Sequence, residues 1–183
     1  MTPLDPTPSQ TVGPFYGYAL PFPGGGDLAA EAALTVHGYV YDGDGAPVPD
    51  ALLEFWQSDP SGSLRGAPGS MRRDPVTGAV AGRHGLDFTG FGRVAVDADG
   101  HWALRTLPPG GATPYISVCV FARGLLHHLY TRIYLAERAG DRLLGGLEPE
   151  RRATLLAAGE RPGVYRFDVH LQGPKETVFL DFG

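Results

Sequence analysis

The chain has 183 residues, a formal net charge of −5 and one cysteine, Cys119. The negative balance offers no basic surface for a phosphate backbone, which argues against nucleic acid as a partner, and a lone cysteine excludes an intrachain disulfide. The 27 glycines and 17 prolines separate short apolar runs, a composition typical of many short strands and tight turns. We therefore expect residues 1–183 to form a single all-β domain.

Residues 1–20 are predicted to form an extended N-terminal arm, because four of them are proline and few local hydrogen bonds can form. The arm lacks the basic start and apolar centre of a secretory signal, and no later run reaches the roughly 20 apolar residues of a membrane helix. We therefore expect a cytoplasmic protein with no membrane partner. The aromatic residues Phe15 and Tyr16 either pack on their own domain or lie against a partner chain or a pocket mouth.

Residues 34–183 are expected to form a sandwich of short strands, with a hairpin or short connection between the first two. The segment 64–87 shows no periodicity and is predicted to be a loop. The segment 147–158 is predicted to be the single helix, because Pro149 suits a first turn and Gly159 can end it. The expected strands are residues 34–41, 51–57, 91–96, 101–107, 115–122, 129–135, 165–171 and 178–182.

The neighbouring strands 115–122 and 129–135, joined by a turn at Arg123 and Gly124, are where we expect function to be decided. The first is a β-branched and apolar run expected to be covered on both faces, so Cys119 should be an inert buried thiol. Alternation on the second strand gives two faces, one with Leu129, Thr131, Ile133 and Leu135 and the other with His128, Tyr130, Arg132 and Tyr134.

Motifs for catalysis or metal binding are weak. No G-x-S-x-G elbow is present, and Gly24 to Gly26 lacks the Lys-Ser/Thr of a phosphate-binding loop. A metal site built from Tyr115, His128 and Tyr130 is one alternative, but His128 and Tyr130, which share a face, lack an evident third ligand. The favoured interpretation is that these side chains are ordinary polar residues of strands whose hydrogen bonds are satisfied within the protein.

Seven segments carry a resemblance to a known family. In chain order they are TPSQTVGPFYGYALPF, GYVYDGDGAPVPDALLEFWQSDPSG, FGRVAVDADGHWALRTLPPG, FARG, LYTRIYL, YRFDVHLQG and VFLDF. Together they resemble the protocatechuate 3,4-dioxygenase α subunits of the intradiol ring-cleavage dioxygenase family over nearly the whole chain. The resemblance implies an intradiol-dioxygenase-type β-sandwich with an extended N-terminal arm and one short helix.

The resemblance also implies that this chain binds no iron. In the catalytic chains of that family, two tyrosines and two histidines hold a non-haem Fe(III). The histidine positions read Tyr115 and Ser117 here, the first tyrosine position reads Leu64, and the second falls near Gly111 or Ala112. The iron would therefore be held by a catalytic β subunit, in an αβ hetero-oligomer that cleaves protocatechuate with O2 to 3-carboxy-cis,cis-muconate.

The substrate pocket implied by the resemblance lies at the interface of the two subunits, with no catalytic residue in this chain alone. The residues implied to line it are Thr11, Gly13, Pro14, Phe15, Tyr16 and Arg123. A guanidinium suits this place because it can pair bidentately with the substrate carboxylate. The alternative for Arg123 is a turn residue paired with a local acid. The alternative for the whole chain is a carbohydrate- or protein-binding β-sandwich without a catalytic partner.

Overall fold

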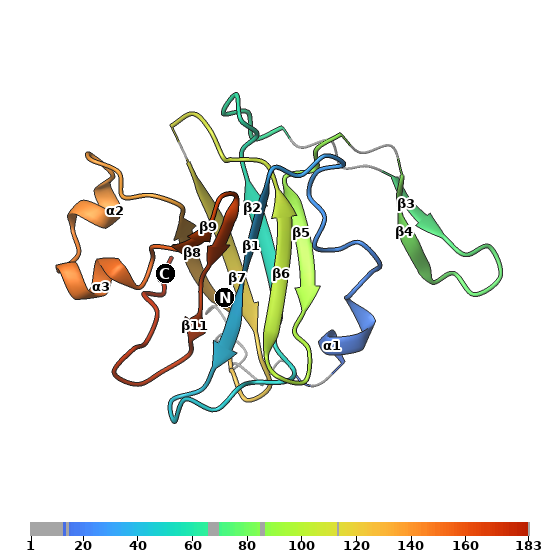
Figure 1. Ribbon diagram of the computed structural model, residues 1–183. Coiled ribbons are helices and arrows are strands. Elements are labelled where there is room, and N and C mark those ends of the chain that lie inside the picture. Colours follow the sequence, from blue (N-terminus) through green and yellow to red (C-terminus); the bar gives the residue numbers. More distant parts are fainter. Residues whose placement is uncertain (1–12, 14, 66–69, 85–86, 113, 183) are drawn as a thin grey trace, which may run out of the picture.

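A computed structural model describes residues 13, 15–65, 70–84, 87–112 and 114–182, and it shows two β-sheets packed face to face (Figure 1). The β1 sheet contains β1 (Leu34–Tyr41), β6 (His101–Thr106), β9 (Ala158–Arg161), β10 (Val164–Arg166) and β11 (Val169–His170). The β7 sheet contains β2 (Leu52–Gln57), β5 (Phe91–Ala95), β7 (Tyr115–Phe121) and β8 (Leu129–Tyr134), in the order β5-β2-β7-β8. The predicted all-β sandwich is therefore confirmed.

Three short helices and a separate hairpin complete the described chain. The helices are α1 (Tyr16–Ala19), α2 (Arg142–Gly145) and α3 (Pro149–Ala153), and the hairpin is β3 (Ser70–Arg73) with β4 (Val80–His84). Figure 1 shows α2 and α3 at one end of the sandwich and the β3–β4 hairpin projecting beyond the opposite side. None of the described helices is long and apolar enough to cross a membrane.

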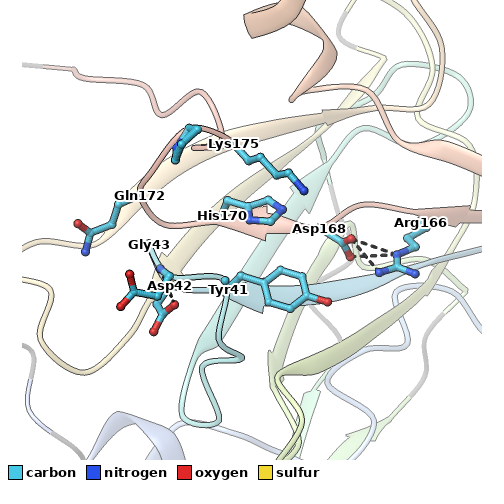
Figure 2. A pocket seen from close by; sticks show the side chains of 11 residues that line it. Tyr41, Asp42, Gly43, Arg166, Asp168, His170, Gln172 and Lys175 are labelled. Atoms are coloured by element: carbon cyan, nitrogen blue, oxygen red, sulfur yellow. Dashed lines mark hydrogen bonds and ion pairs between the residues drawn. The ribbon is translucent and has the colours of Figure 1, made fainter.

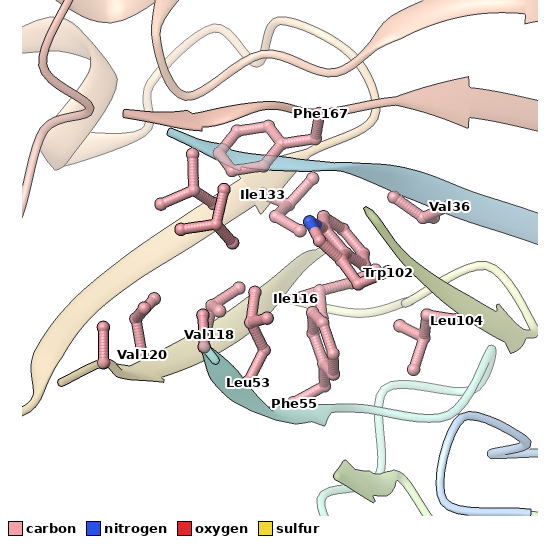
Figure 3. Packing of buried hydrophobic residues seen from close by; sticks show 14 of the residues in the cluster. Val36, Leu53, Phe55, Trp102, Leu104, Ile116, Val118, Val120, Ile133 and Phe167 are labelled. Carbon is pink, nitrogen blue, oxygen red and sulfur yellow. The ribbon is translucent and has the colours of Figure 1, made fainter. Parts of the chain in front are cut away.

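The core lies between the two sheets and follows from strand alternation (Figure 3). On β7 every second residue is buried, so Ile116, Val118 and Val120 point inward. Phe55 from β2 and Trp102 from β6 meet across the sheets with ring centroids 5.1 Å apart. Since these side chains are fully buried, the hydrophobic effect holds the two sheets together and fixes which face of β7 remains outside.

The strand predicted at 165–171 is divided in two. β10 and β11 both pair with β1 in parallel and in the same register, but the ladder is interrupted between them. There the side chain of Asp168 accepts a hydrogen bond from the Tyr39 amide at 3.1 Å, in place of a backbone carbonyl. A Cβ on Gly38 would lie 1.8 Å from the Phe167 carbonyl oxygen, so only glycine allows the two strands to approach this closely.

Several boundaries predicted from the sequence are wrong. The expected loop 64–87 contains the β3–β4 hairpin. Of the expected hairpin or short connection between β1 and β2, the hairpin is excluded, because the two strands belong to different sheets. The expected helix 147–158 ends at Ala153, and the following residues turn back into β9. The expected strand 178–182 is reduced to an isolated bridge between Leu180 and Tyr130.

The predicted extended arm is only partly described, because residues 1–12 and 14 lie outside the described residues. Its described end is not extended: α1 forms one helical turn, and Tyr16 at its start is buried. Three short helices therefore stand where one was predicted. The difference arises because a single turn of four or five residues has no full helical period by which a sequence could reveal it.

Candidate functional site

The outer face of the β7 sheet is hollowed at its centre. Ser117 and Cys119 project outward from β7, and their direct neighbours on β2 and β8 are larger: Trp56, Arg132, Glu54 and Tyr130. Small side chains in a middle strand between large ones leave a depression, because cross-strand neighbours stand side by side on one face. The result is a cavity of about 400 Å³, which we call the β7 pocket. Its lining residues include Trp56, Phe91, Tyr115, Ser117, Arg132 and Phe182.

Arg132 supplies the positive charge of the β7 pocket. Its guanidinium lies 4.0 Å from the ring centroid of Tyr115 and donates to the Tyr134 hydroxyl at 3.3 Å. The other arginine of this face, Arg93, is paired with Glu54, its Nε donating to Oε1 at 2.7 Å. Among the described residues no carboxylate lies within ion-pairing distance of Arg132. A half-buried cation therefore borders an aromatic hollow without a carboxylate partner.

The side chains at the four positions that the resemblance matches with iron ligands do not fit a ferric ion. Gly111 packs against Gly62, so closely that a Cβ on Gly111 would lie 2.7 Å from the Gly62 α-carbon. This contact brings the segment before Tyr115 beside the segment leading to Leu64, which is 53% exposed. Leu64 has no donor atom, and the Arg132 guanidinium over the Tyr115 ring would repel a cation.

The alternative metal site built from Tyr115, His128 and Tyr130 lacks ligands as well. His128 Nε2 lies 2.7 Å from the Tyr130 hydroxyl, so these two side chains satisfy each other. β8 begins at Leu129, so His128 belongs to the connection and does not line the β7 pocket. Throughout the described ranges, no group of three or more His, Cys, Asp or Glu side chains is placed to hold a metal ion.

Arg123 and Tyr16 meet at an acid that the sequence analysis did not name. The Nε atom of Arg123, at the end of β7, lies 3.1 Å from Oδ2 of Asp50. The Tyr16 hydroxyl donates to the backbone carbonyl of Asp50 at 2.7 Å, and its ring contacts Phe121 with centroids 6.4 Å apart. The structure thus brings two of the predicted pocket residues together. It also shows the local acid partner that was the alternative interpretation of Arg123.

The environment holds two potentially ionisable groups neutral. Burial, and then the charge of Asp50, raise the pKa of Tyr16 to about 12. Burial, and then the charge of Glu54, raise the pKa of the Cys119 thiol to about 12. Cys119 is only half-buried, since one face of β7 is open to the β7 pocket rather than covered as predicted. Its thiol nevertheless stays protonated at neutral pH and is a poor nucleophile.

The remaining predicted pocket residues belong to the arm. Gly13 has a φ of +76°, a conformation that favours glycine, and the Phe15 side chain is 68% exposed. Thr11 and Pro14 lie outside the described residues. Of the two aromatic residues at the end of the arm, Tyr16 is buried against its own domain and Phe15 is exposed at the surface.

A second cavity, of about 570 Å³, lies on the outer face of the β1 sheet (Figure 2). Tyr41 stacks on His170 with ring centroids 5.1 Å apart, and Arg166 makes a bidentate ion pair with Asp168, its Nε donating to Oδ1 and its Nη2 to Oδ2. The Asp42 carboxylate accepts hydrogen bonds from the backbone amides of its own turn. None of the predicted site residues lines this cavity.

Sequence reasoning missed Asp50 and the role of Arg132. Asp50 follows two prolines directly before β2, a position that indicates a turn but no long-range contact. Arg132 was placed on the correct face by alternation, yet its stacking on Tyr115 depends on the register between β7 and β8. Only the tertiary structure supplies that register.

The comparisons with known proteins agree with this architecture. Residues 24–119 match the Dioxygenase family. The chain is 44% identical to the protocatechuate 3,4-dioxygenase alpha chain of Burkholderia cepacia, covering 99% of this chain and 100% of that one. It is 35% identical to the protocatechuate 3,4-dioxygenase alpha chain of Pseudomonas putida, covering 98% of both.

Solved structures show the same fold. The dioxygenase domain of a dioxygenase carbohydrate-binding protein fusion from Streptomyces sp. SirexAA-E superimposes with a TM-score of 0.54 at 29% identity, covering 92% of this chain and 99% of that one. An intradiol ring-cleavage dioxygenase from Tetranychus urticae gives a TM-score of 0.54 at 15% identity, covering 84% of this chain and 88% of that one, which supports the fold alone. On its sequence and its fold, the chain belongs to the intradiol dioxygenase family, together with the protocatechuate 3,4-dioxygenase alpha chains.

Proposed function

We propose that this chain is the non-metal α subunit of an αβ hetero-oligomeric protocatechuate 3,4-dioxygenase that acts in the cytoplasm. The observation that carries the proposal is the match to two alpha chains over nearly the full length of each chain. The enzyme would cleave the ring of protocatechuate between its hydroxyls, and both atoms of O2 would enter 3-carboxy-cis,cis-muconate. In this family non-haem iron supplies the oxidative chemistry, and the proposal assigns that iron to a catalytic β subunit.

The side chains of this molecule support that division of labour. The position of Tyr115 and Ser117 offers hydroxyls and a neighbouring guanidinium in place of imidazoles. Stable ferric binding needs several oxygen or nitrogen donors converging on one point. This chain would therefore contribute binding surface and assembly contacts, while the β subunit performs the oxidation.

Arg123 is the residue we propose to recognise the substrate carboxylate at the subunit interface. Asp50 engages its Nε edge, and the side chain is 70% exposed, so a second anion can reach the guanidinium from solvent. An arginine held on one side by a carboxylate is pre-oriented, which lowers the entropy lost when a second anion binds. Thr11, Gly13, Pro14, Phe15 and Tyr16 of the arm would form the adjoining wall.

Coexpression with a catalytic β subunit tests the proposal. The two chains should copurify, and the complex should consume protocatechuate and O2 in equal amounts while this chain alone does neither. The rival function, a carbohydrate- or protein-binding sandwich, predicts no stable complex with the catalytic chain. The Streptomyces neighbour favours the enzyme, since the part that matches is its dioxygenase domain.

A further inference from the structure

The β7 pocket is not explained by the proposed interface site, since neither Arg123 nor any described arm residue lines it. Its lining combines aromatic and apolar groups and several hydroxyls with the cation of Arg132 and the carboxylate of Glu54, which is paired with Arg93. The aromatic, apolar and hydroxyl-bearing residues include Trp56, Phe91, Tyr115, Ser117, Tyr130, Leu180 and Phe182. A volume of about 400 Å³ falls within the range of small-molecule sites. The composition indicates a ligand with an aromatic ring and a negative charge.

We propose that the β7 pocket binds a single-ring aromatic carboxylate without a metal. Arg132 is the anion partner, because it lies half-buried at the pocket and no described carboxylate lies within ion-pairing distance of it; Asp141 reaches it only through the Tyr134 hydroxyl. Glu54 cannot serve as a neutralising partner, since Arg93 holds it at 2.7 Å. A carboxylate that enters the hollow completes a charge-assisted pair which the protein leaves open.

The aromatic part of the ligand has two facing walls. Trp56 is 43% exposed on β2 and contacts Phe91, with ring centroids 6.0 Å apart. On the other side, Phe182 is 70% exposed and packs edge-on against Tyr130, with centroids 5.3 Å apart. A planar ring over the small Ser117 side chain would cover apolar surface that is now in water, which favours binding.

Hydroxyl groups at the floor favour ring-hydroxylated acids. Tyr115 and Ser117 project into the pocket from alternate positions of one strand, and each hydroxyl can donate and accept. The proposal concerns this chain alone and does not depend on a subunit partner. The proposed function would stand even if the β7 pocket bound nothing.

Benzoate titrated into the full chain tests the proposal, with tryptophan fluorescence and calorimetry as readouts. The chain has two tryptophans: Trp56 lines the pocket, whereas Trp102 is 1% exposed in the core. We expect benzoate to change the fluorescence of the wild type. In Trp56→Phe the fluorescence change should be lost while calorimetry still detects binding.

Two variants test the positive charge of Arg132 and the open volume above Ser117. Arg132→Met should weaken benzoate binding about tenfold or more, because the charge-assisted pair is lost. Arg105→Met is the matched control, since Arg105 lies on β6 of the other sheet and pairs with Asp27; it should bind benzoate normally. Ser117→Leu fills the hollow and keeps Arg132, so it should abolish binding, and thermal melts verify that each variant is folded.

Uncharged benzamide should bind about tenfold or more weakly than benzoate. Equal binding of the two probes, or normal benzoate binding by folded Arg132→Met, would overturn the assignment of Arg132. Absence of benzoate binding would show that the proposal is wrong. If, in addition, the fluorescence of Trp56 changed only when the catalytic subunit was added, the pocket would be a protein interface.

Discussion

The Arg123→Ala variant separates a substrate-binding arginine from a structural one. Arg123 is 70% exposed and Asp50 32% exposed, so their ion pair is screened by water and should contribute no more than about 1 kcal/mol to stability. Pairing with a partly desolvated substrate carboxylate is worth about 1.5 to 3 kcal/mol. We therefore expect kcat/KM for protocatechuate to fall roughly 10- to 150-fold, with iron content, oligomer size and melting temperature nearly unchanged.

Steady-state oxygen uptake by the assembled complex measures the effect, and catechol is the internal control. Catechol has no carboxylate, so its turnover should change much less than that of protocatechuate. Arg105→Ala removes another exposed, acid-paired arginine and should leave both substrates unaffected. Equal losses for the two substrates in Arg123→Ala would mean that Arg123 supports only the turn and Asp50, and the reasoning would be refuted.

Three further predictions follow from the fold. Deleting residues 1–12 should lower turnover of the complex more than it lowers the melting temperature, because Tyr16 and its bond to Asp50 remain; a normal turnover number would contradict this. Gly38→Ala should cost roughly 1 to 3 kcal/mol in chemical denaturation, since the new Cβ meets the Phe167 carbonyl at 1.8 Å; an unchanged midpoint would refute the contact. Because the pKa of Tyr16 is raised to about 12, its contribution to stability is complete below about pH 10 and is lost as the pH rises toward 12. Tyr16→Phe should flatten that decline in alkaline melts, and an equally steep decline would be evidence against it.

The sequence was most informative where one face of a strand is buried. Alternation located β8 and its inward residues, such as Ile133, whereas β7 was located as an apolar run that indicated burial on both faces. Alternation placed Tyr134 on the same face as Arg132, and the hydrogen bond from Arg132 to its hydroxyl agrees with that assignment, but alternation could not show that this position is covered. Tyr134 is fully buried, because α2 and the following segment cover that end of the sheet and its hydroxyl donates to Asp141 at 3.1 Å.

Features that depend on distant partners could not be predicted. The parallel pairing of β1 with β10 joins residues about 130 positions apart, such as Thr35 and Val164, and no local pattern encodes that choice. Arg123 was identified as a site candidate from its FARG segment, but its contact with Asp50 was not. The hollow above Ser117 likewise arises from cross-strand neighbours rather than from any contiguous motif.

Metal analysis and turnover, measured on this chain alone and after coexpression with a catalytic β subunit, test the central claim most directly. The account predicts no stoichiometric iron and no protocatechuate consumption by the isolated chain, because Leu64, Tyr115 and Ser117 cannot replace the tyrosine and histidine donors. The coexpressed complex should contain iron in proportion to its β subunit and should turn over protocatechuate. Near-equimolar iron with a visible tyrosinate charge-transfer band in the isolated chain, together with activity, would contradict the account.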